Sequence, residues 1–179
     1  RGREWQAAQR LTEEQRTLAL QRLRLASLIQ YLLPGVPCIY YGDEAGIEGY
    51  RDPFCRACFP WGREDKDLIE WYKGLGRMRL ANRDILAEGS YRTLRAENNL
   101  RVFERYIFTE TTRESLLLVA NRSGRPQSIK GLGLDFTGAV PVLGSHLGTV
   151  QVVLPYSGSV MRFSRRLPPP REEPPVQEE

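Results

Sequence analysis

Long apolar runs, histidine and cysteine are scarce in this sequence of 179 residues. Its longest apolar stretch, Val36 to Tyr41, is far shorter than the ~20 residues that a transmembrane helix requires. No charged segment followed by an apolar one stands near the beginning, so no signal peptide is visible. One histidine and three cysteines offer few ligands for a zinc ion. We therefore expect no membrane span, no metal site and no cofactor.

Methionine is scarce as well, and the two present are Met78 and Met161. Because the sequence begins with Arg1, we expect it to be a piece of a longer protein. With 41% hydrophobic and 27% charged residues, the composition is that of a globular protein. The length suits about one domain, or one and a half.

The positive charge is spread along the chain rather than clustered. The net charge is +4, and all but three of the 26 basic residues are arginines. The arginines are scattered, with no dense block beyond Arg165-Arg166. Nucleic-acid binding through phosphate neutralisation requires a clustered basic patch or stripe. The sequence therefore predicts no nucleic-acid partner.

Cys55 and Cys58 form a C-x-x-C pair, and Cys38 is the third cysteine. Such a pair occurs in zinc sites, but zinc needs four ligands and the single histidine, His146, lies far along the chain. A redox pair of the thioredoxin type would open a helix, whereas this one stands between two prolines. We interpret the cysteines as ordinary thiols of a reducing compartment, which favours a cytoplasmic location.

The first part of the chain has the pattern of an α/β protein. Thr12 to Gln15 fits a capping box, and apolar residues then recur at helical spacing as far as Leu32. Pro34-Gly35 ends this helix. The run from Val36 to Tyr41 does not alternate, which is typical of a strand buried on both faces in a parallel sheet.

The pattern changes in the second half of the chain. A loop rich in Gly, Pro and aromatic residues is expected from Gly42 to about Glu64, and a helix from about Lys66 to Asn82. Short strand-like segments follow without further helices: Tyr91 to Leu94, Leu100 to Phe108, Ser115 to Asn121, Val150 to Leu154 and Ser159 to Phe163. Turns are expected between them, at Asn98-Asn99, Ser123-Gly124 and Ser157-Gly158. This spacing indicates an antiparallel sandwich or barrel.

Two motifs carry a resemblance to a known family. Gly35 to Glu44, G-V-P-C-I-Y-Y-G-D-E, resembles the segment around the eighth barrel strand of glycoside hydrolase family 13, the α-amylase family. Gly49 to Trp61 contains D-P-F-C-R followed by aromatic residues, which is similar to the neopullulanase, cyclomaltodextrinase and maltogenic amylase branch. The resemblance extends through Leu118 to Ser123 and covers about residues 10 to 164.

This resemblance implies a (β/α)₈ TIM barrel followed by a C-terminal antiparallel β-sandwich. Residues 1–86 would form the end of the barrel, with helix 7, strand 8 and helix 8. Residues 87–166 would form the sandwich. The Pro- and Glu-rich tail, residues 167–179, cannot bury a core and is expected to be disordered.

For the parent protein the resemblance implies a retaining glycosidase that acts on α-1,4 or α-1,6 bonds of maltodextrin, cyclodextrin or pullulan. Its partner would be an α-glucan oligosaccharide. Retaining enzymes use two carboxyl groups, and in this family these residues, with a third Asp beside a His, would precede residue 1. We therefore expect no catalytic residue in this sequence and no hydrolysis by this chain alone. The alternative is a non-catalytic carbohydrate-binding or scaffolding β-sandwich module.

Four residues are candidates for substrate binding. Asp52 and Arg56 match the D-P-x-C-R positions, which the resemblance assigns to a glucose subsite, and together they offer acceptors and donors to sugar hydroxyls. The alternative is a simple ion pair of the loop. Tyr50 and Trp61 could stack on sugar rings, or could pack locally beside prolines.

Asp43 and Glu44, at the end of the expected strand, are candidates for shaping the loop by hydrogen bonding, with direct sugar contact as the alternative. The expected strand over 36–41 would have lost both barrel neighbours in this chain. Exposed large apolar side chains and open strand edges favour association, so we expect self-association through this segment.

Overall fold

The structure, a computed structural model, describes residues 2–131, 133–145, 147 and 151–168. His146 and all of the expected tail except residues 167 and 168 lie outside these ranges. The helices are α1 (Arg3–Ala8), α2 (Glu13–Leu32), α3 (Lys66–Ala81) and α4 (Arg83–Ala87). The strands are β1 (Ser90–Glu97), β2 (Leu100–Phe108), β3 (Thr112–Asn121), β4 (Gln127–Ser128), β5 (Val140–Gly144), β6 (Val152–Val153) and β7 (Ser157–Arg166). Within the described ranges, no helix combines the length and the apolar character needed to cross a membrane.

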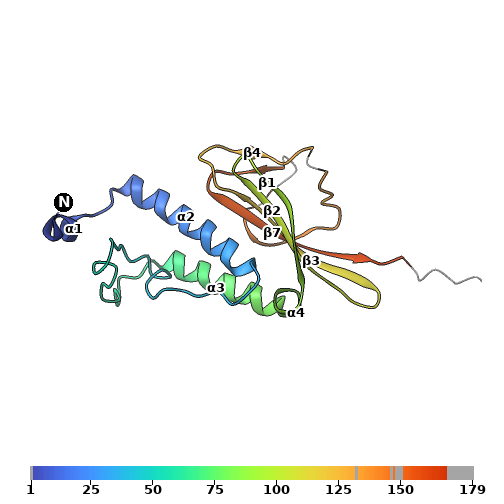
Figure 1. The fold of residues 1–179 in the computed structure, drawn as a ribbon, viewed down its shortest axis with the longest axis horizontal. Coiled ribbons are helices and arrows are strands. Elements are labelled where there is room, and N and C mark those ends of the chain that lie inside the picture. Colours follow the sequence, from blue (N-terminus) through green and yellow to red (C-terminus); the bar gives the residue numbers. More distant parts are fainter. Residues whose placement is uncertain (1, 132, 146, 148–150, 169–179) are drawn as a thin grey trace, which may run out of the picture.

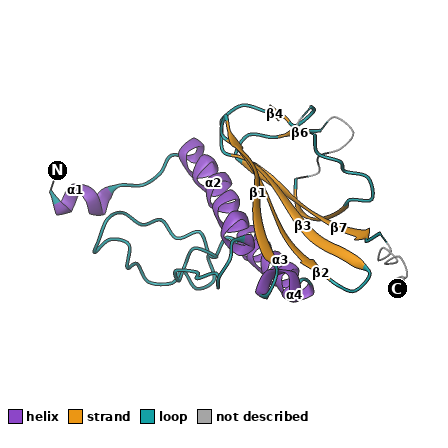
Figure 2. Cartoon of the chain, turned by 45° about the vertical axis from the view of Figure 1, so that its right-hand side comes forward, coloured by secondary structure: helices purple, strands orange, loops and turns teal. Residues whose placement is uncertain are grey.

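Both long helices that the sequence predicts are present, and each has an N-cap. The Thr12 hydroxyl accepts from the Gln15 amide at 3.3 Å, while the Gln15 side chain accepts from the Thr12 amide at 3.0 Å, so the capping box is confirmed. The Asp65 carboxylate caps α3 by accepting from the Leu68 amide at 3.0 Å. Figures 1 and 2 show the two helices on one side of the sheet.

The strand predicted over 36–41 is not formed, and this prediction is wrong for the chain by itself. These residues belong to no helix or strand, and Val36 is 91% exposed. Ile39, Tyr40 and Tyr41 are also exposed. A strand exists through hydrogen bonds to a neighbouring strand, and no described strand pairs with this segment. Its apolar side chains therefore lie at the surface.

The second half forms the predicted antiparallel sheet, in the order β1-β2-β3-β7-β5. Side chains of the central strand β3 alternate between its two faces. Leu116 and Leu118 pack in one core with the buried faces of α2, α3 and α4. Leu117 and Val119 point the other way, into a second core with Val153 of β6. The sheet is thus covered on both faces, by helices on one and by β4, β6 and their loops on the other (Figure 2).

The turn between β1 and β2 lies at Asn98-Asn99, as predicted, and both residues have positive φ. The turn predicted at Ser157-Gly158 is wrong, because both residues begin β7. Packing explains why a glycine stands at position 158, because a Cβ there would lie 3.0 Å from the Leu28 side chain of α2. The glycine marks close approach of a helix to the sheet rather than a turn.

A buried arginine joins the helices to the sheet. Arg105 of β2 is 2% exposed, and its guanidinium donates to the carbonyls of Leu32, Leu86 and Gly89 at 3.3, 3.0 and 2.8 Å. The Leu32 carbonyl belongs to the last residue of α2, and the Leu86 carbonyl lies near the end of α4. At both helix ends the main-chain oxygens lack helical partners. One side chain therefore satisfies acceptors from both helices and from the start of the sheet.

Candidate functional site

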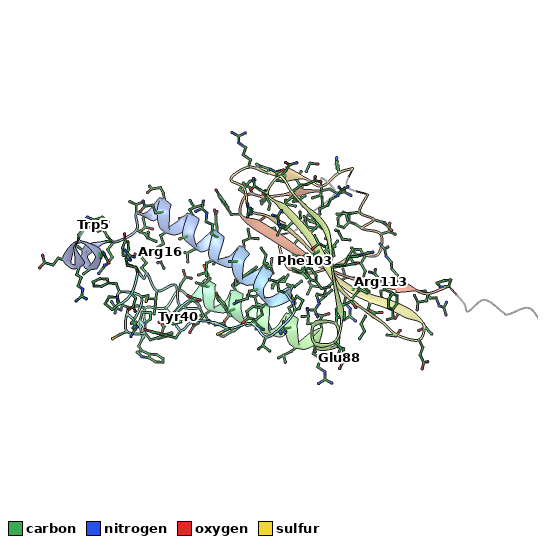
Figure 3. The ribbon with its side chains drawn as sticks, in the orientation of Figure 1. Trp5, Arg16, Tyr40, Glu88, Phe103 and Arg113 are labelled. Atoms are coloured by element: carbon green, nitrogen blue, oxygen red, sulfur yellow. The ribbon has the colours of Figure 1, made fainter. Side chains whose placement is uncertain are left out.

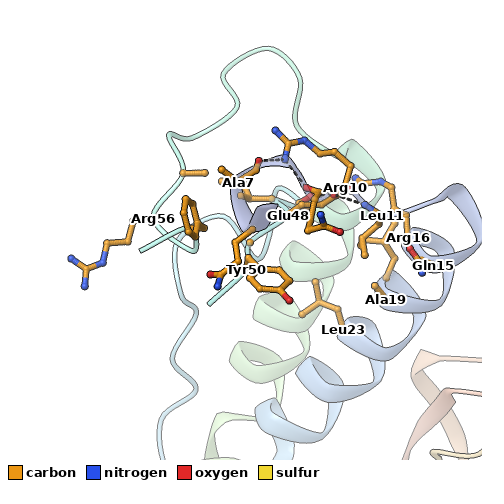
Figure 4. A pocket seen from close by; sticks show the side chains of 18 of the residues that line it. Ala7, Arg10, Leu11, Gln15, Arg16, Ala19, Leu23, Glu48, Tyr50 and Arg56 are labelled. Carbon is orange, nitrogen blue, oxygen red and sulfur yellow. Dashed lines mark hydrogen bonds and ion pairs between the residues drawn. The ribbon is translucent and has the colours of Figure 1, made fainter. Parts of the chain in front are cut away.

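A cavity of about 860 Å³ lies between α1, the first half of α2 and the loop that follows residue 45 (Figure 4). Its lining is mixed, with apolar residues such as Leu20, Leu23 and Phe54 beside the polar Gln15 and Glu48. A cavity of this size with a few polar groups suits a small-molecule ligand. It is the candidate functional site.

Arg16 holds the loop against the two helices. From α2 its guanidinium contacts the Glu48 carboxylate at 3.2 Å and the Asp65 carboxylate, the cap of α3, at 3.7 Å. It also donates to the carbonyl of Gly46 at 3.2 Å. The other Glu48 oxygen accepts from the Leu11 amide at 3.1 Å. Arg16 and Glu48 both line the cavity, so their ion pair holds the loop at its wall. Figure 3 shows Arg16 at the helical end of the molecule.

Arg56 is among the residues that line the cavity, and Asp52, with which it forms an ion pair, is not. Their charged groups are 2.8 Å apart, and both side chains are about two thirds exposed, at 64% and 68%. The Arg56 guanidinium points away from the cavity in Figure 4. The Cys55 thiol donates to the same Asp52 oxygen at 3.8 Å. An ion pair so exposed contributes about 0–1 kcal/mol to stability, so its polar groups remain open to a ligand.

The two aromatic candidates take different positions. Tyr50 lines the cavity, and its ring meets Trp5 of α1 edge-on, with centroids 6.0 Å apart. Trp61 is 82% exposed, packs on Phe59 with centroids 4.7 Å apart, and is not part of the lining. The structure therefore brings Tyr50 and Arg56 to one cavity and leaves Trp61 apart.

Asp43 and Glu44 lie in the turn that ends the apolar segment. Glu44 accepts from the Gly42 amide at 3.0 Å, so it makes a hydrogen bond within the turn. Burial raises the pKa of Asp43, and the neighbouring Glu44 carboxylate acts in the same direction. Neither carboxyl group lines the cavity.

Sequence patterns do not identify Arg16, Glu48 and Asp65 as a group. They are far apart in the chain, and each has an ordinary local explanation, on a helix, in a loop or at an N-cap. Among the residues that the structure describes, no three His, Cys, Asp or Glu side chains gather as metal ligands would.

No family model matches the sequence. Similar individual proteins and solved structures are found, however, and they agree with one another. Over 90 residues the chain is 47% identical to an amylopullulanase of Thermoanaerobacter thermohydrosulfuricus, a match that covers 50% of this chain and 6% of that protein. Over 122 residues it is 35% identical to a cyclomaltodextrinase of a Bacillus species, covering 67% of this chain and 21% of that one.

A solved structure agrees with the sequence matches. The maltogenic amylase of S. marinus superimposes with a TM-score of 0.61 at 26% identity, over 79% of this chain and 19% of that one. The chain thus spans about a fifth or less of the length of these three relatives.

Proposed function

We propose that this chain belongs to the α-amylase family of glycosidases, over the segment that it shares with amylopullulanases, cyclomaltodextrinases and maltogenic amylases. From this premise, it is the C-terminal part of an α-glucan-acting enzyme. The complete enzyme hydrolyses or transfers α-1,4 or α-1,6 glucosidic bonds with retention of configuration. Its two catalytic carboxyl groups come from the part of the parent outside this sequence. The identity of 47% to an amylopullulanase is the observation that carries this proposal.

In this proposal the loop after residue 42 contributes one side of the sugar cleft. The Asp52 carboxylate accepts hydrogen bonds from sugar hydroxyls, and the Arg56 guanidinium donates to them. Tyr50 offers an apolar ring face in the adjoining cavity. Asp43 and Glu44 shape the turn that leads into the loop, and Trp61 adds an exposed ring beyond it. The exposure of the ion pair supports this role, because Asp52 and Arg56 can each give up their contact with the other and bind a ligand instead.

We also propose how this chain is divided within the complete enzyme. Residues 1–86 close a (β/α)₈ barrel, residues 87–166 form a β-sandwich and residues 167–179 form a tail. In the barrel, residues 36–41 form a strand between two neighbours supplied by the parent. The exposed apolar side chains of this segment support the assignment, because an exposed apolar patch marks a surface that a partner segment covers.

Without those neighbours, the isolated chain self-associates through residues 36–41. Light scattering on the purified 179-residue chain tests this, and we expect a mass above 20.5 kDa that falls when Ile39 and Tyr40 are replaced by Ser. A single monomeric species of the unchanged chain would contradict it. The three free thiols support a reducing, cytoplasmic compartment.

The enzyme itself is tested on the full parent, expressed from the gene that encodes this chain. We expect sugar release from maltodextrin or pullulan with retention at the anomeric carbon, followed by NMR. Arg56→Met lowers kcat/KM by about tenfold or more if the guanidinium holds a sugar. The matched control is Arg83→Met, which removes an arginine of another exposed ion pair, with Asp84.

Two outcomes would overturn the proposal. One is a parent that cleaves no α-glucan, and the other is an Arg56→Met enzyme that equals the Arg83→Met control. If the parent is inactive but binds maltotriose in calorimetry, the alternative of a non-catalytic carbohydrate-binding module is favoured instead. The sheet domain supports that alternative, because both of its faces are covered by this chain's own residues.

A further inference from the structure

The thiols of Cys55 and Cys58 are not used by the function proposed above. Both are free; Cys55 is half-buried and Cys58 is exposed. Only Arg56 and Ala57 separate them, and Arg56 is one of the two residues proposed to hold a sugar. A chemical change at these two sulfurs would therefore act on the site itself.

Cys55 is in direct contact with the ion pair. Its Sγ donates to Asp52 Oδ1 at 3.8 Å, and the same oxygen contacts the Arg56 guanidinium at 2.8 Å. A disulfide has no S–H to donate. Oxidation of Cys55 would thus remove a hydrogen-bond donor to this oxygen.

The main chain around the two cysteines is held unevenly. Gly49 packs closely against Cys55, since a Cβ at Gly49 would lie 3.1 Å from the Cys55 Cα. Residues 56–60 belong to no helix or strand. Inside the pair, the Arg56 amide donates to Pro53 and the Ala57 carbonyl accepts from the Tyr41 hydroxyl. A disulfide needs Cα atoms about 4.4–6.8 Å apart, and we expect the exposed Cys58, rather than Cys55, to move as the pair closes.

We propose that Cys55 and Cys58 are a reversible thiol–disulfide site, and that closing the disulfide separates Arg56 from Asp52 and weakens glucan binding. The effect on glucan rests on the proposed function, whereas the disulfide itself does not.

The chemistry is an exchange with a low-molecular-weight disulfide such as oxidised glutathione. The exposed Cys58 thiolate attacks one glutathione sulfur, forms a mixed disulfide and releases a glutathione thiolate. The Cys55 thiolate then attacks the Cys58 sulfur and releases the second glutathione. Two protein thiols lose two electrons and two protons, and oxidised glutathione becomes two glutathione thiols.

The bond is tested by mass spectrometry of the 179-residue chain carrying Cys38→Ser, which leaves only the pair. After oxidised glutathione, we expect a mass lower by two hydrogens, no retained glutathione, and a peptide in which Cys55 and Cys58 are joined. The matched control adds Cys58→Ser and should retain one glutathione on Cys55 or none. Free thiols, or a lasting mixed disulfide on the chain with both cysteines, would overturn the proposal.

The coupling is tested by NMR of the Arg56 side-chain Nε–H in the same two chains. Oxidation should shift this resonance, dithiothreitol should restore it, and the Cys58→Ser chain, in the fraction that carries no glutathione, should show no change. A disulfide that leaves the Arg56 resonance in place would refute the coupling. In the full parent, the disulfide should lower kcat/KM for maltodextrin by about tenfold, reversibly. A parent inactive on glucans in both states would count against the proposed function and leave the thiol site standing.

Discussion

Arg105 donates from the middle of β2 to the main-chain carbonyl of Leu32, the last residue of α2. Carbonyls at a helix C-terminus carry partial negative charge, which favours a nearby cation. Burial lowers the pKa of Arg105, and the neighbouring Arg79 acts in the same direction. Arg79 itself donates to Tyr31 and Gly35, so two arginines bind the end of α2, one from the sheet and one from α3.

Arg105→Met should therefore lower the free energy of unfolding by about 3 kcal/mol, because three buried or half-buried carbonyls lose their donor. Urea denaturation followed by circular dichroism measures this. Arg101→Met on the same strand is the matched control. Within the described ranges Arg101 donates only to the adjacent Leu100 carbonyl, so this variant should cost less than about 1 kcal/mol. Equal losses in the two variants would contradict the role of Arg105.

Tyr72 should make the protein sensitive to alkali. Burial, aided by the nearby Asp43 carboxylate, raises the pKa of Tyr72 to about 12. Between pH 10 and 12 the folded chain keeps the Tyr72 proton that the unfolded chain releases. The contribution of Tyr72 to the free energy of unfolding is therefore fully present below pH 10 and is lost as the pH rises toward 12. Between these limits the loss should reach about 1–2 kcal/mol, and Tyr72→Phe should remove it. Parallel pH profiles of the two chains in urea denaturation would refute this.

Asp43 contributes to that shift through its charge. Asp43→Asn removes the negative charge that opposes the Tyr72 phenolate, so the pKa of Tyr72 should fall toward its ordinary value. The absorbance of the phenolate, compared with the Tyr72→Phe chain, measures the change. Glu44→Gln is the matched control and should act more weakly, because burial and then Asp43 contribute more to the Tyr72 shift than Glu44 does. A larger effect of Glu44→Gln would contradict this ranking.

Arg16→Met should loosen the loop that borders the cavity. The variant loses ion pairs to Glu48 and Asp65 and the hydrogen bond to Gly46. We expect faster hydrogen exchange of the amides of residues 46–48 and a cost of about 1 kcal/mol, since the pairs are partly exposed. Arg22→Met, on the same helix but in contact with Tyr156, should leave these amides unchanged. If both variants exchange alike, Arg16 does not hold the loop.

Local patterns in the sequence predict the elements that depend on local interactions. The α2 capping box needs only Thr12 and Gln15, and β2 and β3 follow from dense apolar residues that the sheet buries on both faces. The segment over 36–41 has an equally clear pattern, yet it forms no strand, because strand formation depends on partners that no local pattern contains. The sequence does not predict the short β5, because Pro141 within it is unfavourable in a strand interior.

The candidate site was predicted in part for a similar reason. Asp52 and Arg56 are four residues apart, so their pairing is within reach of a sequence argument. The cavity beside Tyr50 is formed by α1, α2 and a distant loop, and nothing in the spacing of Arg16 and Glu48 indicates that they meet across it.

The core shared by α2, α3 and the sheet also determines how this polypeptide can be divided. Leu28 and Leu75 of the helices are buried in one cluster with Phe103 and Leu118 of the strands. A protease cut near Gly89, where the secondary structure changes from helical to extended, would therefore leave apolar surface exposed on both products if they separate. The two halves should melt in one cooperative transition, and engineering that transplants the sheet to another protein would have to carry its helices along.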